Sequence, residues 1–352
     1  MRAVRFLSFG GELDVVQIAD PEPPEHGAVI RVEATGVCRS YWHGWQGHDP
    51  DVVPPHVPGH EFAGVVHTVG SAVRRWRGGE RVTAPFVCGC GACPMCARGD
   101  QQVCERQTQP GFTHDGSFAE FVVIHHADAN LVALPADLGF VDAAALGCRF
   151  ATAYRAVVQQ GRIAPGQWVS IHGCGGVGLS AVMVAVAAGA RVVAVDVSPA
   201  ALELAAELGA EIRVNPAELD HAGPEQIGAA VITATDGGAQ LSMDAVGTPT
   251  SCAASVYSLA RRGRHVQVGL LPPALGRPPL PMDRVTAYEL EVVGSHGMAA
   301  HTYPPLLAAV MTGGLRPNRL VTRRIGLDDL PDALTDLGSG APHPGITVAV
   351  VR

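Results

Sequence analysis

The first 147 residues combine short β-type runs with frequent glycine and proline. Runs rich in β-branched and aromatic residues occur at 28–33, 62–69, 81–84 and 118–124. Turn-forming residues separate these runs, which is typical of short strands joined by loops. The pattern predicts an irregular, mostly antiparallel β domain over residues 1–147.

From residue 148 onward, strand-type and helix-type segments alternate. A buried strand is predicted at 168–172, followed by a glycine turn and a helix rich in Ala and Val to about residue 188. The later elements are a strand at 191–195, a helix at 200–208, and strands at 241–246 and 265–268. Such alternation predicts a parallel, doubly wound α/β sheet over residues 148–290.

Residues 291–352 form a third stretch, with a helix predicted at 303–312 and a last strand at 346–351. The longest apolar stretch, 179–195, is interrupted by Gly189 and Arg191. It therefore reads as a helix followed by a strand and not as a membrane span.

Composition narrows the classes of function. Of the 352 residues, 47% are hydrophobic and 16% are charged, which fits a compact enzyme better than a disordered chain. The net charge of −8 and the lack of a basic run argue against nucleic-acid binding. All 25 basic residues are arginine, which excludes a lysine Schiff base or general base. The first 17 residues do not resemble a signal peptide, so we expect a cytoplasmic protein.

Four of the nine cysteines follow the spacing Cys-x2-Cys-x2-Cys-x7-Cys: Cys90, Cys93, Cys96 and Cys104. Four thiolates on so short a loop can complete a tetrahedral zinc site with no open position. Such a closed site is structural. Two disulfides are the alternative, which is disfavoured because nothing else in the sequence indicates an oxidising compartment.

A glycine fingerprint directly follows the strand predicted at 168–172. Its sequence, Gly173-Cys174-Gly175-Gly176-Val177-Gly178, fits G-x-G-x-x-G. The glycines permit a tight turn and close approach of a pyrophosphate, and the helix N-terminus offers free N–H groups. Asp196, 18 residues beyond Gly178, ends the next predicted strand. A carboxylate there accepts hydrogen bonds from the adenosine ribose and repels a 2′-phosphate, so NAD is favoured over NADP. A purely structural glycine turn is the alternative.

Three further motifs hold candidate metal ligands: GVCRSYWH around Cys38, PGHEFAG around His60 and LGCRFAT around Cys148. Together with the four-cysteine loop and the glycine fingerprint, they resemble the zinc-dependent alcohol dehydrogenases of the medium-chain dehydrogenase/reductase superfamily. The resemblance covers essentially the whole chain. It implies a GroES-like β catalytic domain at 1–147, a Rossmann domain at 148–290, and a C-terminal segment at 291–352 that returns to the catalytic domain.

The resemblance also implies two zinc ions per subunit, and NAD. Cys38, His60 and Cys148 would bind the catalytic zinc and leave its fourth position to water or a substrate oxygen. Glu61 matches a carboxylate beside that zinc, either an occasional ligand or a structural support. Ser40 matches a hydroxyl that relays the substrate proton. His43 matches the outer histidine that exchanges this proton with solvent, unless it is an ordinary surface histidine.

Other positions are carried over from the family for the cofactor. Thr152 and Val177 would pack behind the nicotinamide ring, and Arg39 would meet the pyrophosphate. The backbone of Val268-Gly269-Leu270 would hold the carboxamide.

Three departures from the family stand out. Tyr41 replaces an acidic residue that usually supports the zinc-binding histidine, which predicts either weaker catalytic zinc or a substitute partner. Ala201 replaces a frequent lysine, and Ile346 a phosphate-binding arginine. The loss of both positive charges predicts looser binding of NAD.

The sequence thus predicts a zinc- and NAD-dependent alcohol dehydrogenase that interconverts an alcohol with its aldehyde or ketone. Phe86 and Phe112 fall where the family lines its substrate pocket and favour an apolar substrate, although core packing explains them equally well. A polyol, amino-alcohol or thiol-adduct dehydrogenase is an alternative. A non-catalytic zinc- and NAD-binding protein is another, against which Ser40 and His43 argue. The family implies a homodimer or homotetramer.

Overall fold

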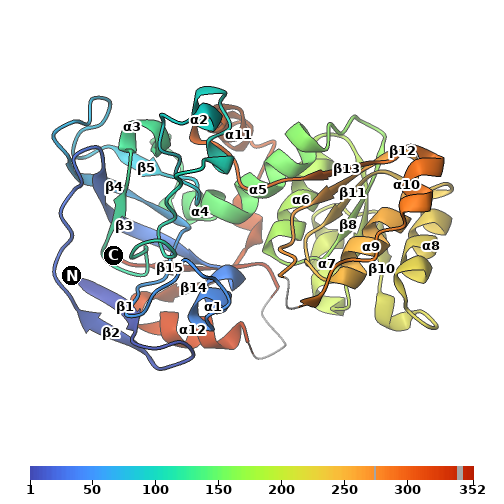
Figure 1. The fold of residues 1–352 in the computed structure, drawn as a ribbon, viewed down its shortest axis with the longest axis horizontal. Coiled ribbons are helices and arrows are strands. Elements are labelled where there is room, and N and C mark those ends of the chain that lie inside the picture. The colour runs from blue at the N-terminus through green and yellow to red at the C-terminus, as the bar shows by residue number, and fades with distance from the viewer. Residues whose placement is uncertain (273–274, 339–343) are drawn as a thin grey trace. The chain divides into compact units, whose positions relative to one another are not determined.

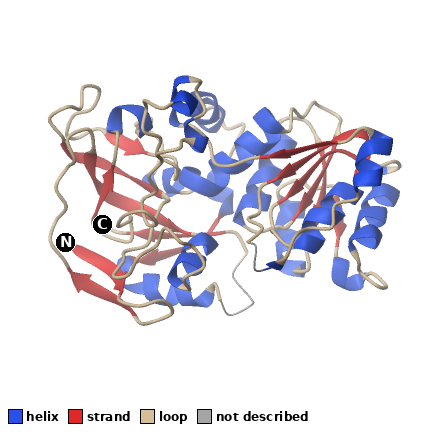
Figure 2. Cartoon of the chain, in the orientation of Figure 1, coloured by secondary structure: helices blue, strands red, loops and turns tan. Residues whose placement is uncertain are grey.

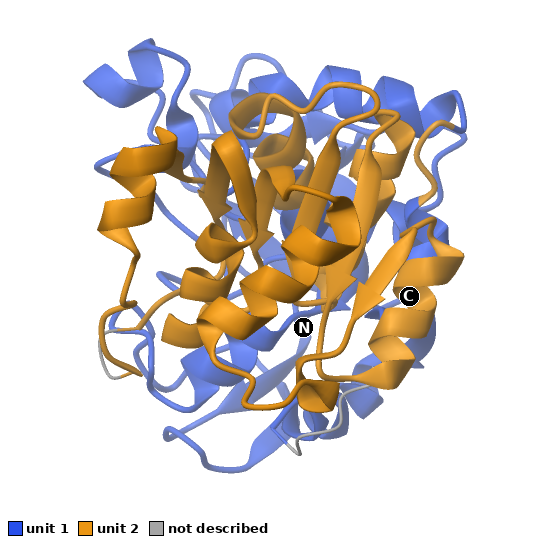
Figure 3. Ribbon diagram, turned by 90° about the vertical axis from the view of Figure 1, so that its right-hand side faces the viewer, with its two compact units in different colours: residues 1–151, 297–313, 317–352 blue, residues 152–296, 314–316 orange. Residues whose placement is uncertain are grey.

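The computed structural model describes residues 1–272, 275–338 and 344–352, which divide into two compact units (Figure 3). Unit 1 comprises Met1–Ala151, Gly297–Gly313 and Pro317–Arg352, and unit 2 comprises Thr152–His296 and Gly314–Arg316. The chain therefore leaves unit 1 after the first 151 residues and rejoins it at residue 297. No helix in the described ranges is long and apolar enough to cross a membrane.

Unit 1 is built on a seven-stranded sheet with the order β14-β15-β3-β4-β5-β7, in which β6 also pairs with β3. Figure 1 labels β3, β4, β5, β14 and β15 of this sheet. The strands are β3 (Ala28–Val37), β4 (Phe62–Val69), β5 (Arg81–Thr83), β6 (Phe121–Ile124), β7 (Val132–Ala133), β14 (Val321–Gly326) and β15 (Ile346–Val350). The β14–β15 pairing is parallel and the others are antiparallel. A separate antiparallel hairpin joins β1 (Arg2–Phe6) and β2 (Leu13–Gln17).

One face of the sheet of unit 1 lies on an apolar core. Ala28, Ile30 and Val32 of β3 share one core with Phe62 and Val66 of β4. This alternation is the period of a strand with one face on a core. The helices around the sheet are α1 (Arg39–Trp45), α2 (Pro94–Ala97), α3 (Ala127–Asn130), α4 (Phe140–Ala144), α11 (Tyr303–Met311) and α12 (Leu330–Asp336) (Figure 2).

Unit 2 contains a six-stranded sheet whose pairings are all parallel, in the order β10-β9-β8-β11-β12-β13. The strands are β8 (Trp168–His172), β9 (Arg191–Val195), β10 (Ile212–Val214), β11 (Ala239–Asp244), β12 (Leu259–Gln267) and β13 (Glu291–Gly294). The α-helices are α5 (Ala151–Tyr154), which enters unit 2 at Thr152, and α6 (Gly176–Ala187), α7 (Pro199–Glu207), α8 (Pro224–Thr235), α9 (Pro249–Tyr257) and α10 (Met282–Tyr288). This is the strand order of the Rossmann fold, whose switch point lies between the first and fourth strands, here β8 and β11.

The predicted fold class is confirmed, and β4, β8 and β9 have the bounds that the sequence predicts. The strand predicted at 118–124 is too long, since β6 begins at Phe121. The reason is that Phe118 bonds to other segments: its N–H donates to the Pro58 carbonyl, and its carbonyl accepts from Val4.

Candidate active site and metal centres

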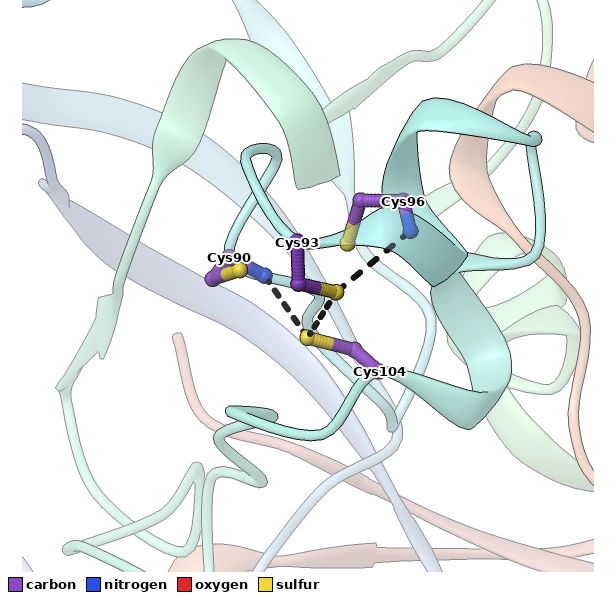
Figure 4. Close-up of side chains that lie close together, drawn as sticks. All are labelled: Cys90, Cys93, Cys96 and Cys104. Carbon is purple, nitrogen blue, oxygen red and sulfur yellow. Dashed lines mark hydrogen bonds between the residues drawn. The ribbon is translucent and has the colours of Figure 1, made fainter.

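The four-cysteine loop brings its sulfurs around one point (Figure 4). Cys96 lies on α2, and Cys90, Cys93 and Cys104 lie in the irregular backbone on either side. The four Sγ atoms all lie within 4.8 Å of one another, and none of these residues is more than 9% exposed. All nine cysteines lie in the described ranges and are free there, so this cluster holds no disulfide.

The geometry of this loop fits a closed zinc site. Zinc–sulfur bonds of about 2.3 Å hold tetrahedral sulfurs about 3.8 Å apart, and the Cys93 and Cys104 sulfurs are 3.6 Å apart. Backbone N–H groups of Cys90 and Arg106 each donate to the Cys104 sulfur at 3.3 Å. The N–H of Cys96 lowers the pKa of Cys93 to about 6, which favours the thiolate that zinc requires at this position. Burial raises the pKa of Cys96 to about 12 and also raises that of Cys104.

A second cluster in unit 1 contains Cys38, His60 and Cys148. Cys38 is the N-cap of α1 directly after β3, His60 lies just before β4, and Cys148 lies on a π-helical turn, Leu146–Phe150. Their ligand atoms and a carboxylate oxygen of Glu61 all lie within 4.8 Å of one another. The structure thus brings together the three residues predicted to bind the catalytic metal.

The chemistry of this cluster also fits zinc. Neither ring nitrogen of His60 has a hydrogen-bond partner among the described residues, although His60 is only 1% exposed. A buried polar atom without a hydrogen-bond partner destabilises the folded state, and a bound cation would provide a partner for one of the two ring nitrogens. The hydrogen bond between the two thiols lowers the pKa of Cys38 well below its usual value and raises that of Cys148 well above it, so Cys38 is the one that favours the thiolate. Two sulfurs and one imidazole leave one position of a tetrahedral zinc for another ligand.

Glu61 is held by a buried arginine. The Arg149 backbone N–H and Nε donate to Glu61 Oε1 at 3.0 and 2.9 Å, and Nη2 donates to Oε2. Both residues are buried, and they are 88 positions apart in the sequence. This fork-to-fork pairing favours the structural role of Glu61 over that of an occasional metal ligand.

Aromatic rings surround His60. The ring centroids of Phe86 and Phe112 lie 5.6 and 5.4 Å from that of His60, and the Tyr41 centroid lies 4.2 Å away. Phe112 is buried and Phe86 is half-buried. Both predicted substrate-pocket residues therefore contact a predicted metal ligand.

The predicted proton-relay residues lie on α1. The Ser40 hydroxyl is 3.5 Å from the Cys38 sulfur. His43 is half-buried, and its Nδ1 is 3.0 Å from Nδ1 of the exposed His48. Burial, followed by the charges of His48 and Arg39, lowers the pKa of His43, so its ring is neutral at neutral pH. Arg39 is exposed and donates to the Leu337 carbonyl at 2.9 Å.

In unit 2 the glycine fingerprint connects β8 to α6. Gly173 has a φ of +96°, which favours glycine, and a Cβ at Gly175 would meet no atom within 4 Å. Gly175, the N-cap of α6, thus leaves room beside the free N–H groups of Gly176, Val177 and Gly178. Such a cradle fits a pyrophosphate.

Asp196 directly follows β9, and each of its carboxylate oxygens accepts a backbone N–H. Cys174 donates at 2.6 Å and Ser198 at 2.8 Å. These bonds fix the carboxylate beside the glycine turn, where a ribose acceptor is expected.

The other predicted cofactor positions are placed as follows. Val177 is half-buried on the first turn of α6, and Thr152 is buried with no partner for its Oγ1 among the described residues. Val268, Gly269 and Leu270 follow β12, and Leu270 is 65% exposed. Ile346, by contrast, is fully buried in β15, so its side chain belongs to the core of unit 1.

Sequence reasoning missed three polar residues beside these sites. Arg149 lies in the motif LGCRFAT, where a lone charge within an apolar stretch is a signal for a buried partner. Asp244 and Gln267 end β11 and β12. Asp244 is fully buried and accepts from the Val246 N–H at 3.0 Å and from Gln267 Nε2 at 2.7 Å. Polar residues at the ends of parallel strands were the available signal.

These features define an α/β protein with a dinucleotide-type Rossmann sheet and two zinc-type ligand clusters. Two family models match the chain: the alcohol dehydrogenase GroES-like domain over residues 24–136 and the zinc-binding dehydrogenase over residues 176–312. An alcohol dehydrogenase of Geobacillus stearothermophilus is 35% identical over 303 residues, or 84% of each chain.

Solved structures agree with the family models. Alcohol dehydrogenase TADH from Thermus sp. ATN1 is 31% identical, with a TM-score of 0.89 over 100% of both chains. A zinc-binding dehydrogenase from Sinorhizobium meliloti 1021, solved with NADP bound, is 29% identical, with a TM-score of 0.86 over 99% of both chains. The chain belongs to the zinc-type alcohol dehydrogenase family of the medium-chain dehydrogenase/reductase superfamily, as its motifs predict. It is therefore an oxidoreductase of a family that uses zinc and a nicotinamide dinucleotide.

Proposed function

We propose that this protein is a zinc- and NAD-dependent alcohol dehydrogenase that reversibly converts an alcohol into its aldehyde or ketone. The single observation that carries the proposal is the cluster of Cys38, His60 and Cys148, because its buried imidazole has both nitrogens free of other partners in the described chain. When bound there, zinc would supply Lewis-acid polarisation of the substrate oxygen. NAD, when bound by unit 2, would accept the hydride.

The residues of this cluster and its surroundings would bind the metal and transfer the substrate proton. Cys38, His60 and Cys148 would hold the metal, and Arg149 would keep Glu61 from competing as a ligand. Ser40 lies beside the Cys38 sulfur and would take up the hydroxyl proton of the alcohol as it passes its own proton on. His43 would receive that proton, because its lowered pKa keeps it neutral and ready to accept.

Asp196 supports the choice of NAD over NADP. Its carboxylate is fixed by two backbone donors, and no arginine follows it in Val197-Ser198-Pro199-Ala200 to pair with a 2′-phosphate. The exposed apolar side chains of Val197, Val246 and Leu270 follow the carboxyl ends of β9, β11 and β12. Ligands of open α/β sheets bind at this edge, where these side chains would contact the cofactor.

Phe86 and Phe112 support an apolar substrate. Their rings lie against His60, so a substrate oxygen bound near this ligand would have carbon substituents close to aromatic carbon. Aliphatic and benzylic alcohols fit this setting better than polyols.

The test is NADH formation by the purified, zinc-loaded protein. Panels of primary aliphatic, benzylic, secondary and polyol alcohols would be offered with NAD or NADP, and zinc would be counted by mass spectrometry. We expect turnover of an apolar class, with at least a 10-fold higher kcat/KM for NAD. Silence across all panels with two zinc ions bound per subunit would overturn the proposal.

A further inference from the structure

Tyr41 contacts the predicted metal ligand His60 in two ways. Its hydroxyl accepts the backbone N–H of His60 and, at 2.8 Å, the N–H of Glu61. Its ring centroid lies 4.2 Å from that of His60 at an interplanar angle of 57°. The hydroxyl thus fixes the backbone of the ligand, and the ring restricts rotation of the imidazole.

Tyr41 is itself firmly held. It is 1% exposed, and its ring packs edge-on against Phe118 at 5.0 Å and lies 6.2 Å from Phe112. A buried side chain packed in this way can act as a rigid support.

Among the described residues, no hydrogen bond orients the His60 ring. Metal-binding histidines usually donate their second ring nitrogen to a carboxylate, a carbonyl or water, which fixes the ring. Here neither ring nitrogen has such a partner, and the nearby Glu61 carboxylate is paired with Arg149. Orientation must therefore come from packing and from the backbone. Phe86 and Phe112 contribute packing only, whereas Tyr41 contributes both a ring contact and a hydrogen bond to the backbone.

We propose that Tyr41 is a positioning residue for the catalytic metal, replacing a hydrogen bond to the imidazole with a ring contact and a clamp on the ligand's backbone. The inference rests on the proposed metal site. It predicts that Tyr41 strengthens zinc binding, contrary to the weaker site that the loss of an acidic residue suggests. Supports of this kind contribute roughly 10- to 100-fold in metal affinity.

The test compares zinc release from Tyr41→Phe, which keeps the ring, and Tyr41→Leu, which loses both contacts. Thr83→Val is the matched control, because it removes another buried hydroxyl of unit 1, bonded to the Phe62 carbonyl at 2.6 Å. Zinc loss to a chelator would be followed by metal analysis at constant temperature. Cobalt substitution would report ligand geometry at the Cys38–His60–Cys148 site through its visible absorption bands.

We expect the wild type and Thr83→Val to hold two zinc ions per subunit. Tyr41→Phe should lose one of them about 10-fold faster and Tyr41→Leu faster still, with shifted cobalt bands. Retention of the four-cysteine zinc would show that unit 1 is still folded. If both variants release zinc at the wild-type rate and show wild-type cobalt bands, the role of Tyr41 is overturned, while the proposed metal site stands. A wild-type protein that binds only one zinc would overturn the proposed metal site as well.

Discussion

The Glu61–Arg149 pair lies directly against Gly36 of β3, where the backbone carries no side chain. A Cβ there would overlap Glu61 Oε2 and lie 2.9 Å from Arg149 Nη2. We predict that Gly36→Ala pushes the pair apart and lowers the free energy of unfolding by roughly 1–3 kcal/mol, the usual cost of forcing an extra methyl group into a packed core. Urea unfolding of the zinc-loaded protein would measure this.

Gly294→Ala is the matched control for this substitution. Gly294 ends β13 and is exposed, its added Cβ would meet nothing within 4 Å, and its φ is not positive. The control should stay within about 0.5 kcal/mol of the wild type, as surface changes usually do. A Gly36→Ala protein as stable as this control would show that the pair adjusts to the extra methyl group.

Individual residues differed in how well the sequence predicted them. Cys38, His60 and Cys148 were selected because their motifs resemble those of a known family, and the structure brings them together. The Glu61–Arg149 pair was missed because it joins positions 88 apart, and no local pattern encodes such a contact. The contacts of Tyr41 were missed for the same reason, since they depend on how α1 packs against the segment before β4.

The loops after β11 and β12 are tied together by one side chain. Gln267 Nε2 donates to Asp244 Oδ2 and to the Gly269 carbonyl, both at 2.7 Å, and its Oε1 is 3.1 Å from His265 Nε2. Gln267→Leu should loosen the segment predicted to hold the carboxamide and raise the Kd for NADH about 10-fold, with zinc content unchanged. Titration by NADH fluorescence would measure it.

Gln240→Leu is the control at the opposite edge of the same sheet. Gln240 Oε1 accepts the Trp168 N–H at 2.8 Å, at the start of β8. Because the dinucleotide is expected at the carboxyl edge, this variant should bind NADH like the wild type. If NADH binding weakens equally in both variants, the lower affinity results from general loosening of the sheet and not from the loop after β12.

Elements with strong local signals were predicted closely. Strands β8 and β9 are short apolar runs bounded by turn residues, and α6 follows a glycine fingerprint, so their positions follow from the chain itself. Strands β10 (Ile212–Val214) and β13 (Glu291–Gly294) were missed. They are short, mostly not buried, and lie at the two edges of the sheet, where burial imposes little pattern on the sequence.

Each unit holds a histidine in its neutral form, the half-buried His114 in unit 1 and the buried His172 in unit 2, and this makes the stability of the protein depend on pH. Burial lowers the pKa of His114 in unit 1 to about 4 and that of His172 in unit 2 to about 3. An unfolded histidine titrates near 6.5. Between these values the unfolded state binds protons that the folded state does not, so stability is present above about pH 6.5 and is lost as the pH falls.

His114→Gln isolates one part of this effect. Glutamine can still donate to the Val123 carbonyl, which lies 3.1 Å from His114 Nε2, but it does not titrate. The free energy of unfolding of the variant minus that of the wild type should increase by about 2 kcal/mol as the pH is lowered from 7 to 4.5. Denaturant unfolding at a series of pH values would measure it. Protonation of the zinc ligands affects both proteins alike and cancels in the difference, so a difference that stays constant with pH would show that His114 is not held neutral by the fold.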